Sequence, residues 1–171
     1  MTGGLVERAQ QAWAGYSPHE HKPLATYAGI SSVFAAALGA ALLAAARAGR
    51  LPERVGAGDI VLVGVATQKL SRLATKGKVT SWIRAPFTEY EEPGAPAEVN
   101  ERPRGTGVQA AVGELLACPF CLAQWLTAGF TCGLMFAPRL TRSVASIYVA
   151  QTISDFLQFG YSAAESAESR A

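Results

Sequence analysis

Two long runs without a charged residue most constrain how this chain can fold. The first run, residues 24–46, reads "LATYAGISSVFAAALGAALLAAA" and lies between Lys22 and Arg47. At about 1.5 Å per helical residue, a helix of this length crosses a hydrocarbon core of about 30 Å. The second run covers residues 115–138. Together they predict membrane-spanning helices.

Two further segments are weaker candidates for spans. Residues 143–161 are interrupted only by Asp155 and are long enough to cross. Residues 59–73 have a short uncharged part, so Lys69 and Arg72 would have to reach the headgroups. This segment is predicted to be a short span, with a buried or interfacial helix as the alternative. The fold prediction is an all-α, polytopic transmembrane helical bundle with three or four spans.

The composition agrees with a membrane protein and argues against nucleic acid as a partner. Half of the 171 residues are hydrophobic and 16% are charged, a balance that favours membrane proteins. Ten of the 23 residues in the first run are alanine, a weak membrane former, so a soluble helical bundle remains the alternative. The formal net charge of +2 is too small for a nucleic-acid surface.

The domain prediction is a polar N-terminal arm, residues 1–23, followed by one membrane domain, residues 24–171. The arm lacks the apolar core and cleavage site of a secretory signal. With four spans, one side of the membrane carries ten Lys and Arg residues and the other carries five. This bias predicts that both termini and the central loop are cytoplasmic.

The central loop, residues 74–114, is the longest segment outside the predicted spans. In "KGKVTSWIRAPFTEY", Trp82 and Phe87 are predicted to lie at headgroup depth beside Arg84. The following "EEPGAPAEVNERPRG" is typical of irregular, mobile chain. Two interpretations stay open: a surface for a protein partner or for headgroups, and a solvated tether between helices.

Several blocks resemble a known family. The blocks "ATQKLSRL", "KVTSWIRAPFTEYEE", "ERPRGTG" and "GELLACPFCLAQW" are similar to the bacterial membrane-protein family of domain of unknown function 1360, over residues 59–161. The resemblance implies a small polytopic protein of the bacterial cytoplasmic membrane, with some members in sporulating bacteria and no established reaction. The positions that match the family pattern are Arg84, Pro86, Phe87, Arg104, Gly105, Glu114, Cys118, Pro119, Cys121 and Trp125.

The "ACPFC" stretch is the main candidate for chemistry. Pro119 suits the first turn of a helix, which places Cys118 near the N-cap, where the helix dipole favours a thiolate. Cys118 and Cys121 lie about one turn apart, so they could form a redox pair or bind one metal ion. A zinc site would need two more ligands, and the only histidines are His19 and His21. Reduced thiols packed between helices are the preferred interpretation, and neither metal nor cofactor is predicted.

Asp155 is a carboxylate well inside a run predicted to span the membrane, where a charge must be paired, protonated or near water. A position near the end of its helix is the preferred interpretation. An ion pair with Lys69 or Arg72 is the alternative.

The functional prediction is a non-enzymatic structural or interaction component of the membrane, with the lipid bilayer as a partner and a possible protein partner at the central loop. The candidate interface residues are Arg84, Pro86, Phe87, Glu114 and Trp125. The alternative is a membrane thiol oxidoreductase or a redox or metal sensor that uses Cys118 and Cys121. A small transport subunit ranks third. The sequence predicts no oligomeric state.

Overall fold

The computed structural model describes residues 4, 8, 13, 16 and 23–169. Most of the predicted N-terminal arm, including His19 and His21, lies outside these residues. The described chain forms six α-helices, one 3-10 turn (η1) and one β-hairpin. In order these are α2 (Leu24–Arg47), α3 (Ala57–Lys76), η1 (Lys78–Thr80), α4 (Ser81–Arg84), β1 (Thr88–Pro93), β2 (Val99–Pro103), α5 (Gly107–Ala117), α6 (Pro119–Phe136) and α7 (Pro138–Glu168).

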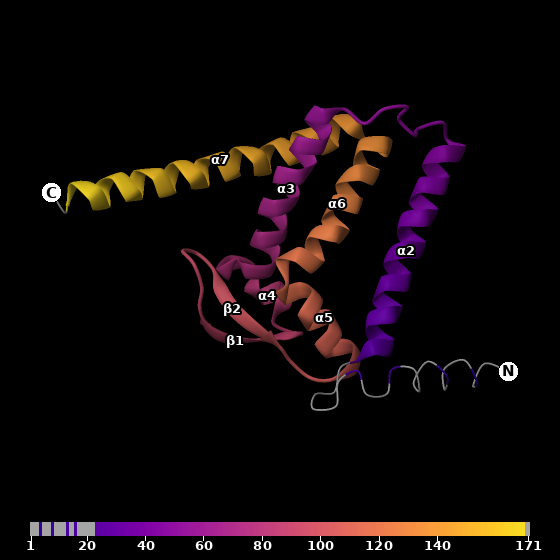
Figure 1. The fold of residues 1–171 in the computed structure, drawn as a ribbon, viewed down its shortest axis with the longest axis horizontal. Coiled ribbons are helices and arrows are strands. Elements are labelled where there is room, and N and C mark those ends of the chain that lie inside the picture. The colour runs from indigo at the N-terminus through magenta and orange to yellow at the C-terminus, as the bar shows by residue number, and fades with distance from the viewer. Residues whose placement is uncertain (1–3, 5–7, 9–12, 14–15, 17–22, 170–171) are drawn as a thin grey trace.

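Three long helices stand side by side, with the hairpin at one end (Figure 1). Helices α2 and α6 run in one direction and α3 runs in the other. Helix α7 starts beside the end of α6, crosses α3 obliquely and projects beyond it. The predicted helices at 24–46, 59–73 and 143–161 thus fall within α2, α3 and α7.

Two of the described helices, α2 and α6, are long and apolar enough to cross a membrane, judged by length and composition. Helices α3 and α7 carry more polar residues and do not reach that standard. The predicted span 115–138 is not one helix, because α5 ends at Ala117 and α6 begins at Pro119.

The apolar core lies where α3, α6 and α7 meet. Val63 and Ala66 of α3 pack with Phe130 of α6 and Ala145 of α7. Around them lie the partly buried side chains of Leu62, Leu70, Leu134, Val144, Tyr148 and Val149. Most of these positions repeat at three or four residues along each helix, as expected for one apolar stripe per helix.

The predicted irregular loop is instead an antiparallel hairpin, so the chain is mostly helical but not all-α. Thr88 pairs with Pro103 at the open end and Pro93 with Val99 near the turn, with a bulge between Tyr90 and Glu92. Prolines and charged residues disfavour a strand. The hairpin therefore needs support from outside its own backbone pairing.

That support is the guanidinium group of Arg84, which is 1% exposed and uses all five of its N–H donors. Two of them bind the Glu101 carboxylate of β2, at 2.8 and 2.9 Å. The others donate to the Ala74 carbonyl at 2.7 Å, the Thr80 hydroxyl at 3.0 Å and the Gly77 carbonyl at 3.1 Å. This paired fork geometry gives strong, directional bonds.

Arg84 thereby joins the end of α3 to the hairpin. The carbonyls of Ala74 and Gly77 belong to the last turn and C-cap of α3, where backbone acceptors lack helical partners and a cation is favourable. The Thr88 hydroxyl donates to Glu101 at 2.8 Å, so the carboxylate has a third donor. Arg84, which was expected beside Trp82 and Phe87 near the headgroups, is buried in the fold.

The first prediction concerns this buried pair. Arg84→Ala leaves Glu101, whose side chain is 5% exposed, without its cation, and we expect unfolding to become easier by about 3–5 kcal/mol. Arg102→Ala is the matched control, because it removes an exposed pair with Glu89 in the same hairpin and should cost less than about 1 kcal/mol. Chemical denaturation of the purified protein in detergent measures both. Equal losses would contradict a central role for Arg84.

The second prediction concerns pH. Burial raises the pKa of Glu101, but the hydrogen bonds from Arg84 and Thr88 and the charge of Arg84 outweigh it, and the pKa lies below its usual range. A depressed carboxyl pKa stabilises the fold above the unfolded value of about 4.3, and this contribution is lost as the pH falls through the folded value. The unfolding temperature of the wild type should therefore decrease as the pH is lowered below about 4. In the Glu101→Gln variant, the unfolding temperature should depend less on pH in that range. A wild-type curve parallel to that of the variant would refute it.

Candidate functional site

The junction between α5 and α6 holds the two neighbouring cysteines. Cys118 has extended backbone angles, φ −105° and ψ 108°. It is both the C-cap of α5 and the N-cap of α6. Pro119 explains the break, because a residue before proline is disfavoured in the helical region and proline itself is well suited to the first helical turn. The predicted N-cap position of Cys118 is confirmed.

The two thiols are in contact and are not joined by a disulfide. The Cys121 backbone N–H donates to Cys118 Sγ at 3.2 Å, so the thiol serves as the helix cap. The Cys121 thiol lies 2.7 Å from Cys118 Sγ. Both cysteines are free, with Cys121 exposed and Cys118 half-buried. Phe120 between them is 88% exposed, so Cys121 and Phe120 present the motif to the surroundings.

Two contacts hold α2 against this junction. The Tyr27 hydroxyl of α2 donates to the Glu114 carboxylate, one turn before Cys118 on α5. Further along, the rings of Phe34 and Trp125 meet edge to face, 5.0 Å between centroids. Glu114 and Trp125, predicted as interface residues, are therefore engaged in contacts between helices.

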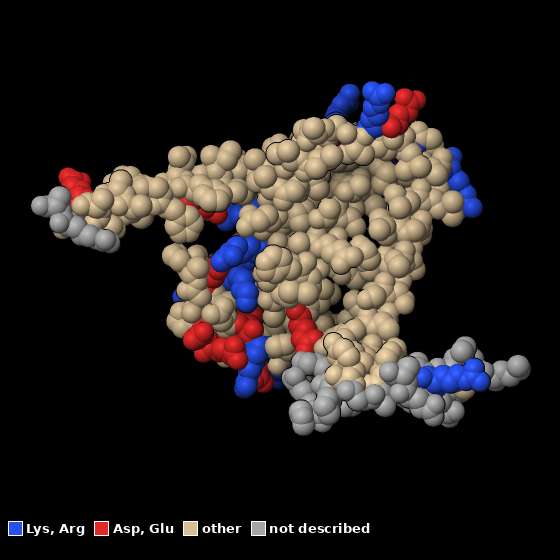
Figure 2. Space-filling view, viewed as in Figure 1, with Lys and Arg blue, Asp and Glu red and all other residues tan. Residues whose placement is uncertain are grey.

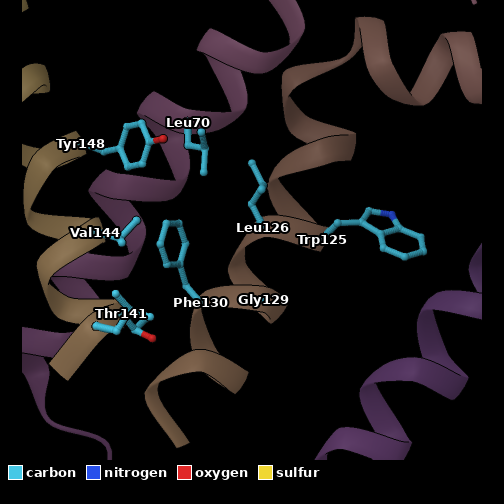
Figure 3. A pocket seen from close by; sticks show the side chains of 9 residues that line it. Leu70, Trp125, Leu126, Gly129, Phe130, Thr141, Val144 and Tyr148 are labelled. Carbon is cyan, nitrogen blue, oxygen red and sulfur yellow. The ribbon is translucent and has the colours of Figure 1, made fainter. Parts of the chain in front are cut away.

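Between α2 and the α5–α6 pair lies an open apolar groove of about 650 Å³. Its walls include Gly29, Ile30, Val33, Val108, Leu122 and Trp125. A smaller hollow of about 360 Å³ lies on the other side of α6. In Figure 3, Phe130 points toward Val144 of α7, whereas Trp125 points to the opposite side of α6, toward α2. Both hollows are open and mainly apolar, and neither contains a constellation of catalytic groups.

The hairpin base carries the other predicted site residues. The Pro86 carbonyl accepts from the Gln109 side chain at 2.8 Å, and the Phe87 carbonyl accepts from the Arg104 backbone at 2.9 Å. Helix α5 approaches this point closely, since a Cβ on Gly113 would lie 2.3 Å from the Phe87 carbonyl oxygen. The Pro86 carbonyl thus binds the hairpin base to α5, and the Phe87 carbonyl closes the base of the hairpin itself.

Asp155 lies well inside α7 and forms an ion pair with Lys69 of α3. Lys69 is one of the two bases named from the sequence. The preferred interpretation, a carboxylate near the end of its helix, is wrong because α7 continues to Glu168. A second pair, Arg142 with Asp59, links the starts of the same two helices with two bonds of 2.8 Å.

The described residues contain no group of three or more His, Cys, Asp or Glu side chains that could hold a metal ion. His19 and His21 lie outside those residues. Of the predicted site residues, Cys118, Cys121 and Glu114 lie near the junction between α5 and α6. Asp155 lies apart from them on α7.

Sequence reasoning missed Glu101, Thr88 and Gly113. Glu101 is one of several glutamates in the central loop, and only the pairing of β2 with β1 turns it toward Arg84. A signal was available in the alternation of Val99 and Glu101, which share one face of β2. The two were not considered because the segment was expected to be irregular.

Comparison with known proteins identifies the family. Residues 62–161, more than half of the chain, match the family described as "Protein of unknown function (DUF1360)". The chain belongs to this family. Within the DUF1360 segment lie the Arg84 network, the cysteine junction and the Lys69–Asp155 pair, whereas α2 precedes it.

One curated relative of this DUF1360 chain is the sporulation protein YjcA of Bacillus subtilis (strain 168). The two are 38% identical over 74 residues, which is 42% of this chain and 62% of YjcA. The match thus covers less than two thirds of the relative's length. No solved structure matches.

The third prediction tests the thiol cap. Cys118→Ala removes the acceptor for the Cys121 N–H, and we expect a loss of about 1 kcal/mol in the free energy of unfolding. Cys118→Ser keeps an acceptor of similar size and should stay close to wild type. Denaturation in detergent under reducing conditions provides the measurement. Equal effects of the two substitutions would show that Cys118 does not act as a cap.

Proposed function

We propose that the chain is a multi-pass protein of the bacterial cytoplasmic membrane that acts as a non-enzymatic interaction component. In this proposal α2, α3, α6 and the 143–161 part of α7 cross the bilayer, and the hairpin and both termini are cytoplasmic. The observation that carries it is the distribution of charge. Figure 2 shows charged side chains at the two ends of the helix layer and over the hairpin, with uncharged surface between them on α2 and α6.

The polar residues of α3 and α7 fit this placement because they satisfy one another. Lys69 would lie between the membrane faces, and its ion pair with Asp155 removes the need for either group to reach water. The contacts of α7 with α3 run from Asp59–Arg142 to Lys69–Asp155, so the two helices head toward the same end. That direction supports a C-terminus on the hairpin side.

The segment between α3 and the hairpin supplies a membrane-surface anchor. Val79, Trp82 and Ile83 are 79%, 74% and 52% exposed, which is unusual for three large apolar side chains so close together. Tryptophan is favoured at headgroup depth. The buried Arg84 side chain fixes this short segment to the end of α3 and to β2. The apolar side chains of Val79, Trp82 and Ile83 are therefore free to enter the membrane surface.

The hairpin then forms the interaction surface on the cytoplasmic side. Glu89, Glu91 and Glu92 are exposed along β1, together with Tyr90. A rigid, acidic strand with an exposed aromatic residue suits a basic protein partner, because charge steers association and tyrosine provides buried contact area.

A second candidate function, a membrane thiol oxidoreductase, is favoured by the 2.7 Å contact between the thiols. Cys118, at the N-cap where the helix dipole favours a thiolate, would attack a disulfide on a partner protein, whose other sulfur leaves as a thiolate. Cys121 would then lose its proton and attack the Cys118 sulfur of the mixed disulfide, which releases the partner's second sulfur as a thiolate. The partner is reduced to a dithiol and the Cys118–Cys121 pair is oxidised. Cytoplasmic thiols are ordinarily kept reduced, which suits a pair that reduces its partner.

The fourth prediction is the labelling pattern of a membrane-impermeant maleimide in a Cys132→Ala variant. We expect Cys118 and Cys121 to react in inverted vesicles without reductant and to stay unlabelled in intact cells, because their end of α6 is cytoplasmic. The control is Glu53→Cys in a cysteine-free chain, since the loop at 48–56 lies at the opposite end and should react only in intact cells.

Two outcomes would change the proposal. Labelling of Cys118 and Cys121 in intact cells only after reduction would reverse the orientation and make the thiol oxidoreductase the first candidate. Release of the protein from membranes by alkaline carbonate would remove the membrane placement altogether.

A further inference from the structure

We infer that the end of the molecule opposite the hairpin binds the phosphate headgroups of anionic lipids. This arginine end consists of Arg47, Arg50, Arg54, Arg139 and Arg142. They come from the last residue of α2, the loop that follows it and the first two turns of α7. Figure 2 shows basic side chains at this end with acidic surface beside them, and the loop after α2 also carries the exposed Glu53. The inference rests on the proposed membrane placement.

Two of these arginines form contacts between different helices and loops at this end. Arg50 donates to the Phe136 carbonyl at 3.1 Å, and its guanidinium carbon lies 5.6 Å from the centre of the Phe136 ring. Arg142 makes its two bonds to Asp59. These contacts bring the chain after α2 to the end of α6, and the start of α7 to the start of α3.

The other three arginines are available to a ligand. Arg47, Arg54 and Arg139 are exposed, and none forms an ion pair within the described part of the chain. A guanidinium group binds phosphate through two parallel N–H donors, which a lysine cannot do. The arginine end has no lysine.

Position favours a lipid over a soluble anion. Arg47 ends α2 and Arg139 follows α6 by three residues, so both lie at headgroup depth if these helices cross the bilayer. Exposed apolar side chains lie between the arginines: Leu51 at 48%, Val55 at 61% and Leu140 at 66%. A mixture of basic and apolar groups fits a membrane surface, with headgroups for the charges and acyl chains for the apolar groups.

The hairpin end is different, although it has more basic residues. Three of its arginines are already paired with carboxylates: Arg72 with Glu98, Arg84 with Glu101 and Arg102 with Glu89. Those ion pairs are internal to the fold, and the bases at that end without an ion pair in the described structure are two lysines and one arginine, Lys76, Lys78 and Arg104. The available guanidinium groups are therefore concentrated at the arginine end.

The test uses the full chain purified in a non-ionic detergent and titrated with phosphatidylglycerol or phosphatidylcholine. The readout is the lipid concentration that gives half of the maximal rise in unfolding temperature. The variant R47Q/R54Q/R139Q removes the three available arginines. The matched control K76Q/K78Q/R104Q removes the same charge at the hairpin end, where none of the three bases forms an ion pair in the described structure.

We expect phosphatidylglycerol to stabilise the wild type and the control at similar concentrations. The arginine-end variant should need more than about tenfold more of it, because each basic residue near a headgroup accounts for about fivefold in affinity. With phosphatidylcholine, the three proteins should differ much less in the lipid concentration that gives half of the maximal rise in unfolding temperature.

Three results would overturn the inference. One is an equal response of all three proteins to phosphatidylglycerol. The others are stabilisation by inorganic phosphate, or by an acidic peptide, at the concentration at which phosphatidylglycerol acts. Carbonate extraction of the same proteins separates this failure from that of the proposed function. A wild type that stays in the membrane but does not distinguish the lipids contradicts only the lipid inference.

Discussion

The buried bond between Arg84 and Glu101 determines how the segment between α3 and α5 is built. An arginine has five N–H donors and no acceptor, so burying it requires acceptors on several sides at once. Here they come from the end of α3, from η1 and from β2. One side chain therefore sets the direction in which the chain leaves α3 and the place where the hairpin stands. Replacing Arg84 by lysine would keep the charge and lose most of these bonds.

The position of the cysteines follows from this arrangement. Strand β2 leads directly into α5, and α5 lies against the hairpin base at Gly113 and Gln109. Helix α5 then ends where Pro119 forces a break, and that break presents Cys118 and Cys121 at the start of α6. The Arg-Ala-Pro-Phe-Thr block and the Cys-Pro-Phe-Cys block are distant in sequence. They are linked through α5, so a defect at Arg84 would also disturb the thiols.

The sequence allowed the local features to be predicted and left the long-range ones open. Uncharged runs predicted α2 and most of α6, and the proline rule placed the α6 N-cap at Cys118. The hairpin was missed because it has little strand propensity and depends on a contact between residues 84 and 101, whose partner is one of many glutamates. The course of α7 was missed for the same reason. Its direction depends on the Arg142–Asp59 pair, which no local pattern predicts, and on the Asp155–Lys69 pair, which the sequence indicated only as an alternative.

The size of the core bears on the choice between a soluble bundle and a membrane protein. The buried apolar residues in the described chain are Ala45, Val63, Ala66, Val99, Ala111, Phe130 and Ala145, and four of these seven are alanine. In water, a chain this long ordinarily buries a far larger apolar surface to offset the loss of conformational entropy. In lipid the helices can leave their apolar faces outward, and association relies on close packing and on polar pairs such as Lys69–Asp155. Many large apolar side chains on α2, α3 and α7 are exposed. That distribution is unfavourable in water and suits a bilayer, which supports the membrane placement on grounds independent of helix length.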